Sequence, residues 1–413
     1  MITIIITKIK EGLIVKLIAK VFLICAYTLN ISAQTQLIDI FKDGVVSGQI
    51  DSTYIQQNFQ NATDTNNYAT ALGGKLKYET ASFEGFNTAV AFYTSQDINF
   101  ATGDRSKVKQ NSELSSDKGS YTQAAEAYIN YGYEGFNLRA GRQVIDTPLA
   151  DSDSIRIIQN TFEAYIATYT NDALTFQAGK LVSWQGYDAG LENGFTPVGK
   201  QGAWLGSASF SNNLFDASAW FYNVTDFSNL FYTDAGTHIH VNNDVLLHVR
   251  AQYINEQELK QSTINAQLYG VKSTVEFEGF AISTAYNKAL VGKDKTSFSG
   301  FGGGALYTNM DTMILKEIAT DRDAEAFVGG ISYTYDNIKL IYAYGDFHGS
   351  ANSLGEKADI IEHNIGFEYN INNDLKLSAI YAKDIDKIDP NNTQTNWDRV
   401  QINIAYNFGG KSK

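Results

Sequence analysis

The sequence predicts an all-β protein, an 18-stranded antiparallel up-and-down β-barrel of the transmembrane type. Three observations predict this fold. Short turns rich in Asn, Asp and Gly alternate along the chain with long, polar connections. Between these breaks, apolar and polar residues alternate, as they do in strands whose two faces meet different environments. Many of the strands end in Tyr, Phe or Trp, which is typical of the aromatic girdles of membrane barrels.

The first 33 residues differ from the rest of the chain. Lys16 and Lys20 precede a short apolar run, residues 21–33, which ends in small residues before Gln34. This pattern predicts a secretory signal peptide cleaved after Ala33, with residues 34–413 forming a single barrel domain. The only cysteine, Cys25, lies in the removed part, so the exported chain is expected to be stable without disulfides.

Charge and hydropathy narrow the class of protein. Residues 1–33 contain four lysines and one glutamate, so their removal lowers the formal net charge from −13 to −16. A chain this acidic is not expected to bind nucleic acid, whose phosphates attract basic proteins. After the first three dozen residues, no apolar stretch approaches the roughly 18 residues that a membrane-spanning helix needs. We therefore expect a β-barrel in the outer membrane of a Gram-negative bacterium.

Tight turns join the strands in pairs. An aromatic–Glu–Gly–Phe motif occurs three times, at residues 83–86, 133–136 and 277–280. Glycine suits the position of a hairpin turn at which φ is positive, and alternating runs flank each motif. The other five tight turns are expected at 169–174, 210–215, 242–244, 335–338 and 370–374.

Longer connections separate the tight turns. Nine are expected, at residues 58–68, 98–121, 144–161, 183–202, 224–237, 255–262, 290–325, 348–361 and 385–397. Eight short and nine long connections join eighteen strands. In outer-membrane barrels the short turns are periplasmic and the long loops are extracellular, so both chain ends are expected on the periplasmic side.

Alternation within the strands predicts which residues face lipid. In the last strand Val400, Ile402, Ile404, Tyr406 and Phe408 share one face, and Arg399, Gln401, Asn403, Ala405 and Asn407 share the other. The strand over 245–253 repeats this pattern. Slipping that strand by one residue would bring Arg250 near the middle of the membrane, at a cost of roughly 2–4 kcal/mol.

The strand number indicates function, because barrels of 16–18 strands leave an aqueous channel. The inward positions are expected to carry Lys75, Lys77, Asn137, Arg139, His248, Arg250, Lys272, Lys339, Arg399 and Asn403. Such a lumen predicts a porin that lets ions and small hydrophilic solutes diffuse passively, without enzymatic activity or a cofactor. The alternative for each of these charged residues is that its charge is solvated and has no role in selecting solutes. Two other functions stay open: an adhesin or receptor, and an outer-membrane enzyme.

The third long connection is the candidate constriction. Its apolar residues, Val144, Ile145, Leu149, Ile155, Ile157 and Ile158, need a surface to pack on. Folding into the pore over about 144–161 would bury them and would bring charged groups to the narrowest point. These are Arg142, Asp146, Asp151, Asp153 and Arg156, whose opposed charges would sort solutes. The alternative is an outward loop packed on itself or on a neighbouring subunit.

Residues of this connection resemble a known family. Gly141-Arg142-Gln143, Thr147-Pro148, residues 151–156 and Phe162-Glu163 are similar to the strand-to-loop passage of the OprD-like outer-membrane porins. The opening strand, residues 43–54, is similar to that family's first strand. The resemblance implies an 18-stranded homotrimeric porin for small polar or carboxylate-bearing solutes, with its third loop narrowing the pore. The expected partners are outer-membrane lipid and lipopolysaccharide, and the barrel-assembly machinery.

Three further motifs resemble ligand-binding patterns. Residues 300–305 match a loose glycine-rich dinucleotide pattern but have no strand–helix context. His238 and His240 share one face of a strand without a third metal ligand close by in sequence. The acidic run at 384–389 lacks the carboxylate spacing and the glycine of an EF-hand. We expect no nucleotide site at the first motif and no metal site at the second, and the third is expected to be a solvated loop that interacts with divalent ions at the lipid surface.

Overall fold

The computed structural model describes residues 38–59, 67–98, 109–110, 113–114, 120–153, 155–191, 194–391 and 396–409. The expected signal peptide lies outside these residues. Among them, no helix has the length and apolar character needed to cross a membrane. A short helical segment, residues 38–42, precedes the first strand.

Twenty strands form a single sheet. Eighteen build the wall, and β4 (Lys109–Gln110) and β9 (Thr196–Pro197) are two-residue strands within connections. The wall strands are β1 (Val45–Phe59), β2 (Asn67–Glu79), β3 (Phe86–Asp97), β5 (Tyr121–Tyr133), β6 (Phe136–Gln143), β7 (Thr161–Asn171), β8 (Leu174–Gln185), β10 (Ala203–Ser211), β11 (Phe215–Val224), β12 (Ser228–His240), β13 (Val245–Glu258), β14 (Ala266–Phe277), β15 (Phe280–Val291), β16 (Ala324–Tyr335), β17 (Ile338–Gly349), β18 (Ala358–Asn370), β19 (Leu375–Asp386) and β20 (Trp397–Gly409).

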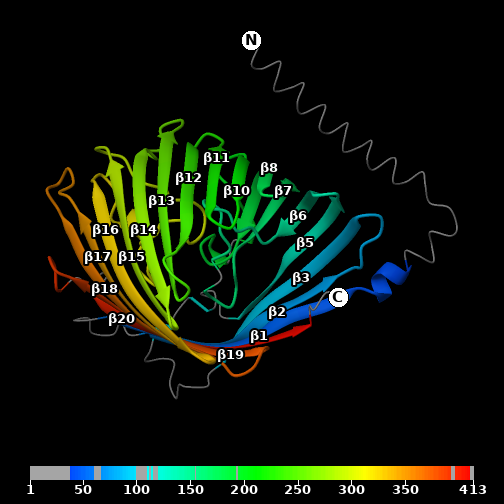
Figure 1. Cartoon of the computed structure of the whole chain (residues 1–413). Coiled ribbons are helices and arrows are strands. Elements are labelled where there is room, and N and C mark those ends of the chain that lie inside the picture. The colour runs from blue at the N-terminus through cyan, green and yellow to red at the C-terminus, as the bar shows by residue number, and fades with distance from the viewer. Residues whose placement is uncertain are drawn as a thin grey trace, which may run out of the picture.

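The wall closes on itself. Each wall strand pairs antiparallel with the next in sequence, and β1 pairs with β20 from Ser47↔Gly409 to Phe59↔Trp397. Figure 1 shows the strands side by side in a ring, with connecting segments crossing its interior. The predicted fold, a closed antiparallel barrel of 18 strands, is confirmed.

The eight tight turns occur where they were predicted, all at one rim of the barrel. In the three repeated motifs both central residues have positive φ, for example Glu278 at 47° and Gly279 at 83°. This is the pairing that a two-residue hairpin loop requires. The described chain ends lie at the same rim, since Ala81 N donates to Ile40 O and Asn407 N donates to Asp374 O.

One predicted connection is wrong. Residues 224–237 were expected to form a long loop, but β12 begins at Ser228 and only residues 225–227 connect it to β11. The stretch is polar, and Asp234 contributes to that polarity. In the structure Asp234 points inward and forms an ion pair with Arg250 of β13, so its charge belongs to a strand.

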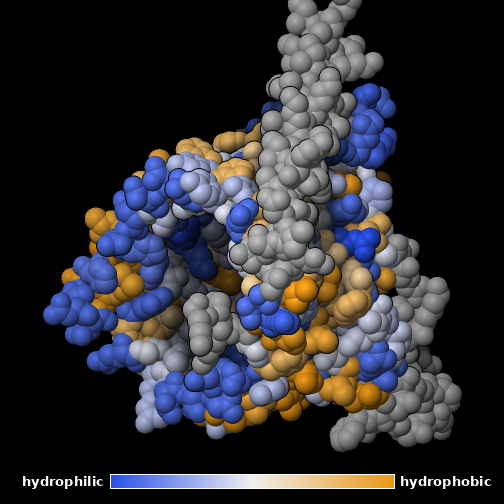
Figure 2. Space-filling model, turned by 90° about the vertical axis from the view of Figure 1, so that its right-hand side faces the viewer, coloured by the Kyte–Doolittle hydropathy of each residue, from blue (hydrophilic) through white to orange (hydrophobic). Residues whose placement is uncertain are grey.

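The outer face of the wall is apolar. Residues of one parity are large and exposed, as the exposed fractions of Leu76 (51%), Val271 (55%) and Ile365 (57%) illustrate. Figure 2 views the barrel from the side of β1–β5 and shows hydrophobic side chains exposed on the wall together with hydrophilic ones. Water would penalise so much exposed apolar surface, and lipid would not, which is typical of a membrane barrel.

Wall residues that face the inside of the barrel form an apolar cluster, which the sequence analysis did not predict. Inward-facing residues of β7 to β18 form it, among them Trp220, Tyr222, Leu230 and Leu268. Apolar residues of two connections, 144–160 and 292–323, pack against them. Part of the interior is therefore filled with side chains, and its charged residues are concentrated elsewhere.

Candidate functional site

The connection 144–160, between β6 and β7, packs against the inside of the wall. Leu149 and Ala150 are almost fully buried in the same apolar cluster as Phe162, Leu181 and Tyr222 of the wall. Ile158 belongs to a second cluster, with Ala91 and Tyr93 of β3. Burial of its apolar side chains against inward-facing residues therefore holds this segment within the ring of strands.

A second connection, 292–323, also lies inside. Its backbone is bound by carboxylates of the wall: Glu256 accepts hydrogen bonds from Phe298 N (2.8 Å) and Ser299 N (2.7 Å). Glu362 accepts from Thr312 N (3.1 Å) and Met313 N (2.6 Å). Ala150 forms a β-bridge with Phe301, so the two inner segments also contact each other.

Five charged side chains meet where these segments approach β20. Arg156 Nη1 lies 2.6 Å from Asp153 Oδ2, and Arg156 Nε lies 3.6 Å from Glu113 Oε2. Arg399 Nη2 lies 2.9 Å from the same Glu113 oxygen, and Arg399 Nη1 lies 2.7 Å from Asp311 Oδ2. We call this series, Asp153–Arg156–Glu113–Arg399–Asp311, the charge chain. It alternates in sign and carries one more negative than positive charge.

Neighbouring contacts fix the charge chain in place. The guanidinium of Arg156 lies over the ring of Tyr187, 4.0 Å from its centroid. Gln401 Nε2 of β20 donates to Ile155 O (2.9 Å), and Lys75 Nζ of β2 donates to Gln159 Oε1 (3.5 Å). The side chain of Arg399 is only 3% exposed, so its partners must compensate its charge.

Burial also changes the acidity of the loop carboxyls. Desolvation raises the pKa of Asp153 to about 6, although Arg156 acts to lower it. Desolvation likewise raises the pKa of Asp311, against the opposing effect of Arg399. The charge of Asp153 therefore changes at moderately acid pH.

The structure brings together some of the residues predicted for the constriction. Asp153 and Arg156 are neighbours in the charge chain. Asp151 lies beside them, where its Oδ1 accepts a hydrogen bond from Asp153 N (2.6 Å). Asp146 is exposed, and its Oδ1 accepts from Ser152 N (3.1 Å), which shapes the loop.

Arg142 is not brought to this cluster. It pairs across the sheet with Ala127, an exposed residue on the outer face of β5. Its guanidinium lies 4.2 Å from the centroid of the Phe195 ring. Gly141 has a φ of 124° at the end of β6. The prediction that Arg142 lines the constriction therefore disagrees with its position on the other face of the wall.

The residues predicted for the lumen lie on the inward parity of their strands. Lys77 Nζ lies 3.1 Å from Glu126 Oε2, and Arg139 lies over the ring of Tyr128.

Arg250 pairs with Asp216 and Asp234, and His248 Nδ1 lies 2.6 Å from His238 Nδ1. Lys272 is the cross-strand neighbour of Arg250, and Lys339 that of Glu368. Asn137 and Asn403 face inward as well, with Asn403 Oδ1 accepting from Thr53 Oγ1 (2.6 Å).

Sequence reasoning missed two members of the charge chain and one inner segment. Glu113 and Asp311 come from the connections 98–120 and 292–323, for which the sequence predicts extracellular loops. A signal for the inner apolar cluster was present, because β11 (Phe215–Val224) carries apolar residues on both parities. A strand whose inward face is also apolar needs something apolar to pack against it.

The glycine-rich motif, the histidine pair and the acidic run make local contacts in the structure. Residues 300–302 pack closely on Leu149 and Asp151 of the other inner segment. His238 contacts His248 and Asp216 rather than His240. Asp384 points inward and accepts hydrogen bonds from Thr312 Oγ1 (3.0 Å to each oxygen), which further fixes the segment 292–323.

No protein-family model and no curated protein matches this sequence. Solved structures do resemble the chain. OccAB3 of Acinetobacter baumannii has a TM-score of 0.76 at 12% identity, covering 89% of this chain and 100% of its own. OpdQ of Pseudomonas aeruginosa has a TM-score of 0.73 at 13% identity, with 90% and 99% covered. The outer membrane protein OpdK of the same organism has 0.73 at 14% identity, with 90% and 100% covered.

These neighbours are OprD-family outer-membrane porins. At such low identity the likeness concerns the arrangement of the chain and leaves its solutes open. It extends over about nine-tenths of the sequence. The chain therefore has the fold of the OprD-like porins, the family that its third connection and opening strand resemble.

Proposed function

We propose that this chain is an outer-membrane porin, a water-filled channel for the passive diffusion of ions and small hydrophilic solutes. Its fold is that of solved outer-membrane channels, and its wall presents an apolar face outward. The charge chain carries the proposal most directly. A row of alternating charges, held where inner segments approach the wall, is suited to select among small polar solutes.

The constriction would be formed jointly by three connections and β20. Glu113, Asp153, Arg156 and Asp311 would project from the connections, and Arg399 from the wall. Asp153 and Asp311 at the two ends, and the two guanidinium groups between them, would produce a transverse field. Solutes with a dipole or with separated charges would cross such a field in preferred orientations.

The expected ion preference is weakly for cations. The chain without its first 33 residues has a formal charge of −16, and the charge chain itself has an excess of one carboxylate. Acidic side chains around a pore attract cations and repel anions. We also propose a homotrimer in contact with lipid and lipopolysaccharide, without enzymatic activity, as the resemblance to the family implies.

Planar-bilayer recording of the purified protein at asymmetric salt tests this proposal. Discrete conductance steps are expected, with a reversal potential of the cation-selective sign. A reversal potential of the opposite sign would reject the selectivity and keep the channel. Protein that is folded, inserted in the bilayer and electrically silent would eliminate the channel itself.

A further inference from the structure

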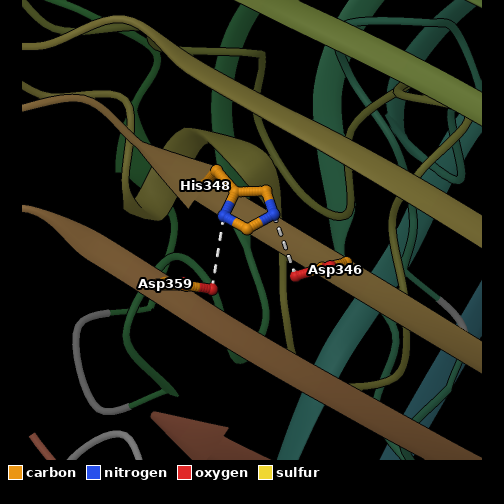
Figure 3. Close-up of side chains that lie close together, drawn as sticks. All are labelled: Asp346, His348 and Asp359. Atoms are coloured by element: carbon orange, nitrogen blue, oxygen red, sulfur yellow. Dashed lines mark ion pairs between the residues drawn. The ribbon is translucent and has the colours of Figure 1, made fainter. Parts of the chain in front are cut away.

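A group of polar side chains lies outside the lumen, at the rim that carries the long connections. Asp346 and His348 are near the end of β17, and Asp359 is near the start of β18, directly across from His348. Their neighbour Phe347 is fully buried on the inward face, so Asp346 and His348 point outward. Figure 3 shows the His348 ring between the two carboxyl groups.

The donor atoms of this group are close together. His348 Nε2 lies 3.1 Å from Asp346 Oδ1, and His348 Nδ1 lies 3.2 Å from Asp359 Oδ1. Each of the three residues offers one ligand atom, and these atoms lie within 4.8 Å of one another. In a tetrahedral site with bonds of about 2.1 Å, ligand atoms are about 3.4 Å apart, so the donor atoms must move closer together. Each ring nitrogen now faces one carboxyl group, so binding also requires the imidazole to turn one nitrogen toward the ion.

The same group already holds one cation. Lys387, just after β19, places its Nζ 3.1 Å from Asp346 Oδ1 and 2.6 Å from Asp359 Oδ1. An ammonium in this position shows that the two carboxylates converge on a point where positive charge is stabilised. The lysine side chain is 34% exposed and is carried on a flexible stem, so it can leave this point for solvent.

We propose that Asp346, His348 and Asp359 form a binding site for a divalent transition-metal ion, of which Zn²⁺ is the representative. The ion takes the point between the carboxylates that Lys387 Nζ otherwise occupies. One imidazole nitrogen and the carboxylate oxygens bind it. The half-exposed side of the ring leaves a coordination position for water. The site is on the outer surface and is independent of the proposed channel.

The donor set decides the class of metal. Imidazole nitrogen favours Zn²⁺, Cu²⁺ and related ions over Mg²⁺ and Ca²⁺, which prefer oxygen ligands alone. Three protein ligands with an open fourth position suit the tetrahedral preference of Zn²⁺. Lys387 competes for the same place, so metal binding must displace it.

Isothermal titration of Zn²⁺ into the full-length, detergent-solubilised protein at neutral pH tests the proposal. One ion per chain is expected at this site. His348→Gln should weaken its binding at least about tenfold, since loss of even an outer partner of a metal site costs 10–100-fold. Lys387→Met should tighten the binding, because the competing ammonium is gone and both carboxylates remain.

Two controls separate this site from other histidines. His363→Gln changes a second outward histidine, which lies on β18 and whose ring contacts Tyr342 and Tyr344. This variant should leave Zn²⁺ binding unchanged. The double variant His238→Gln/His248→Gln removes the histidine pair of the lumen and should also retain this site. Absence of Zn²⁺ binding in the unmodified protein would overturn the proposal. So would binding that persists in His348→Gln or disappears only with the lumenal pair.

If His348→Gln fails to fold, two other variants, Asp359→Asn and Lys387→Met, still test the metal site. Asp359→Asn retains the shape of the side chain and should lower the affinity in the same direction. Folding of each variant is checked by gel electrophoresis in detergent, in which the folded barrel and the heat-unfolded chain migrate differently. If folded Asp359→Asn and Lys387→Met both bind Zn²⁺ as the unmodified protein does, the metal lies elsewhere and the assignment is wrong.

Discussion

Single residues of the charge chain differ in what they contribute to the interior. Arg156 contacts two carboxylates, from Asp153 and Glu113, and stacks on Tyr187. Arg399 contacts two others, from Glu113 and Asp311, and is almost fully buried. Arg156 is the more exposed of the two cations and therefore the better one to remove without disrupting the wall.

Arg156→Gln should make the channel more cation-selective. The variant loses a positive charge and leaves the neighbouring carboxylates in excess. A unit charge about 8 Å from a permeating ion contributes ~0.5 kcal/mol in water, which corresponds to roughly a twofold change in the permeability of each ion, in opposite directions for cations and anions. The measurement is the reversal potential at asymmetric salt. Arg142→Gln, the same substitution on the outer face, should leave it unchanged, and equal shifts in both variants would refute the assigned position of the constriction.

Ion preference should also depend on pH through Asp153. Burial raises the pKa of this carboxyl to about 6, so it is mostly charged at pH 7.5 and mostly neutral at pH 4.5. Protonation removes a negative charge, and cation selectivity should fall as the pH is lowered through about 6. Asp153→Asn keeps the residue size at a position with a φ of 42° and should remove this step. A step near pH 6 of undiminished size in that variant would assign the titration to another group.

At the scale of elements, the turns and the inner segments are held by different means. The three aromatic–Glu–Gly–Phe turns depend on local backbone conformation, with positive φ at both central residues. The segment 292–323 depends on side chains far away in sequence, because Glu256, Asn287 and Glu362 of three strands bind its backbone. Substitutions in the turns should therefore lower the stability of the barrel. Substitutions that release the segment 292–323 should change the conductance of the pore.

Gly279→Ala should destabilise the barrel more than Gly355→Ala. Both glycines have positive φ, 83° and 82°, so alanine is strained by about 1–2 kcal/mol at each. At Gly279 the added Cβ would also lie 2.5 Å from Thr334 O of the neighbouring strand, whereas no atom lies within 4 Å at Gly355. The clash should add about 1–3 kcal/mol to the loss in free energy of unfolding. Guanidinium unfolding of both variants gives the difference, and equal losses would show that the turn can relax.

Glu362→Ala should release part of an inner segment. The variant leaves Thr312 N and Met313 N without their acceptor, at a cost of about 1–3 kcal/mol for each buried group. We expect larger or noisier single-channel conductance and faster trypsin cleavage after Lys316, which follows closely. Glu368→Ala is the matched control, because Glu368 is an inward carboxylate of the same strand that pairs with Lys376. Identical behaviour of the two variants would mean that Glu362 does not anchor the segment.

Elements set by local chemistry were predictable from the sequence, and those set by distant contacts were not. The repeated aromatic–Glu–Gly–Phe motif identifies its turns because φ and residue type are coupled. Alternation identifies the faces of β13 and β20. Residues 228–237 could not be recognised as a strand, because the charge of Asp234 is neutralised by Arg250 of the neighbouring strand. No local pattern in the sequence indicates that contact. Arg399 and Glu113 are 286 residues apart, so no sequence spacing indicates that they meet.

At the scale of the whole molecule, closure of the wall decides what the interior can be. Eighteen strands enclose more space than the inward side chains of a small barrel would fill. Here the apolar cluster and the inner segments occupy part of that space, and in another part the charge chain joins the inner segments to β20. The proposed channel therefore runs beside an apolar packed region rather than through a uniformly polar tube.

Swelling of liposomes that contain the purified protein tests most directly whether this barrel is a water-filled channel. Liposomes placed in isotonic solutions of neutral sugars of increasing size should swell, and the rate should fall steeply as the sugar grows, because a constricted channel passes the smallest solutes fastest. If liposomes carrying folded protein swell no faster than protein-free liposomes, even with the smallest sugar, the interior is closed to solutes and the porin function is wrong.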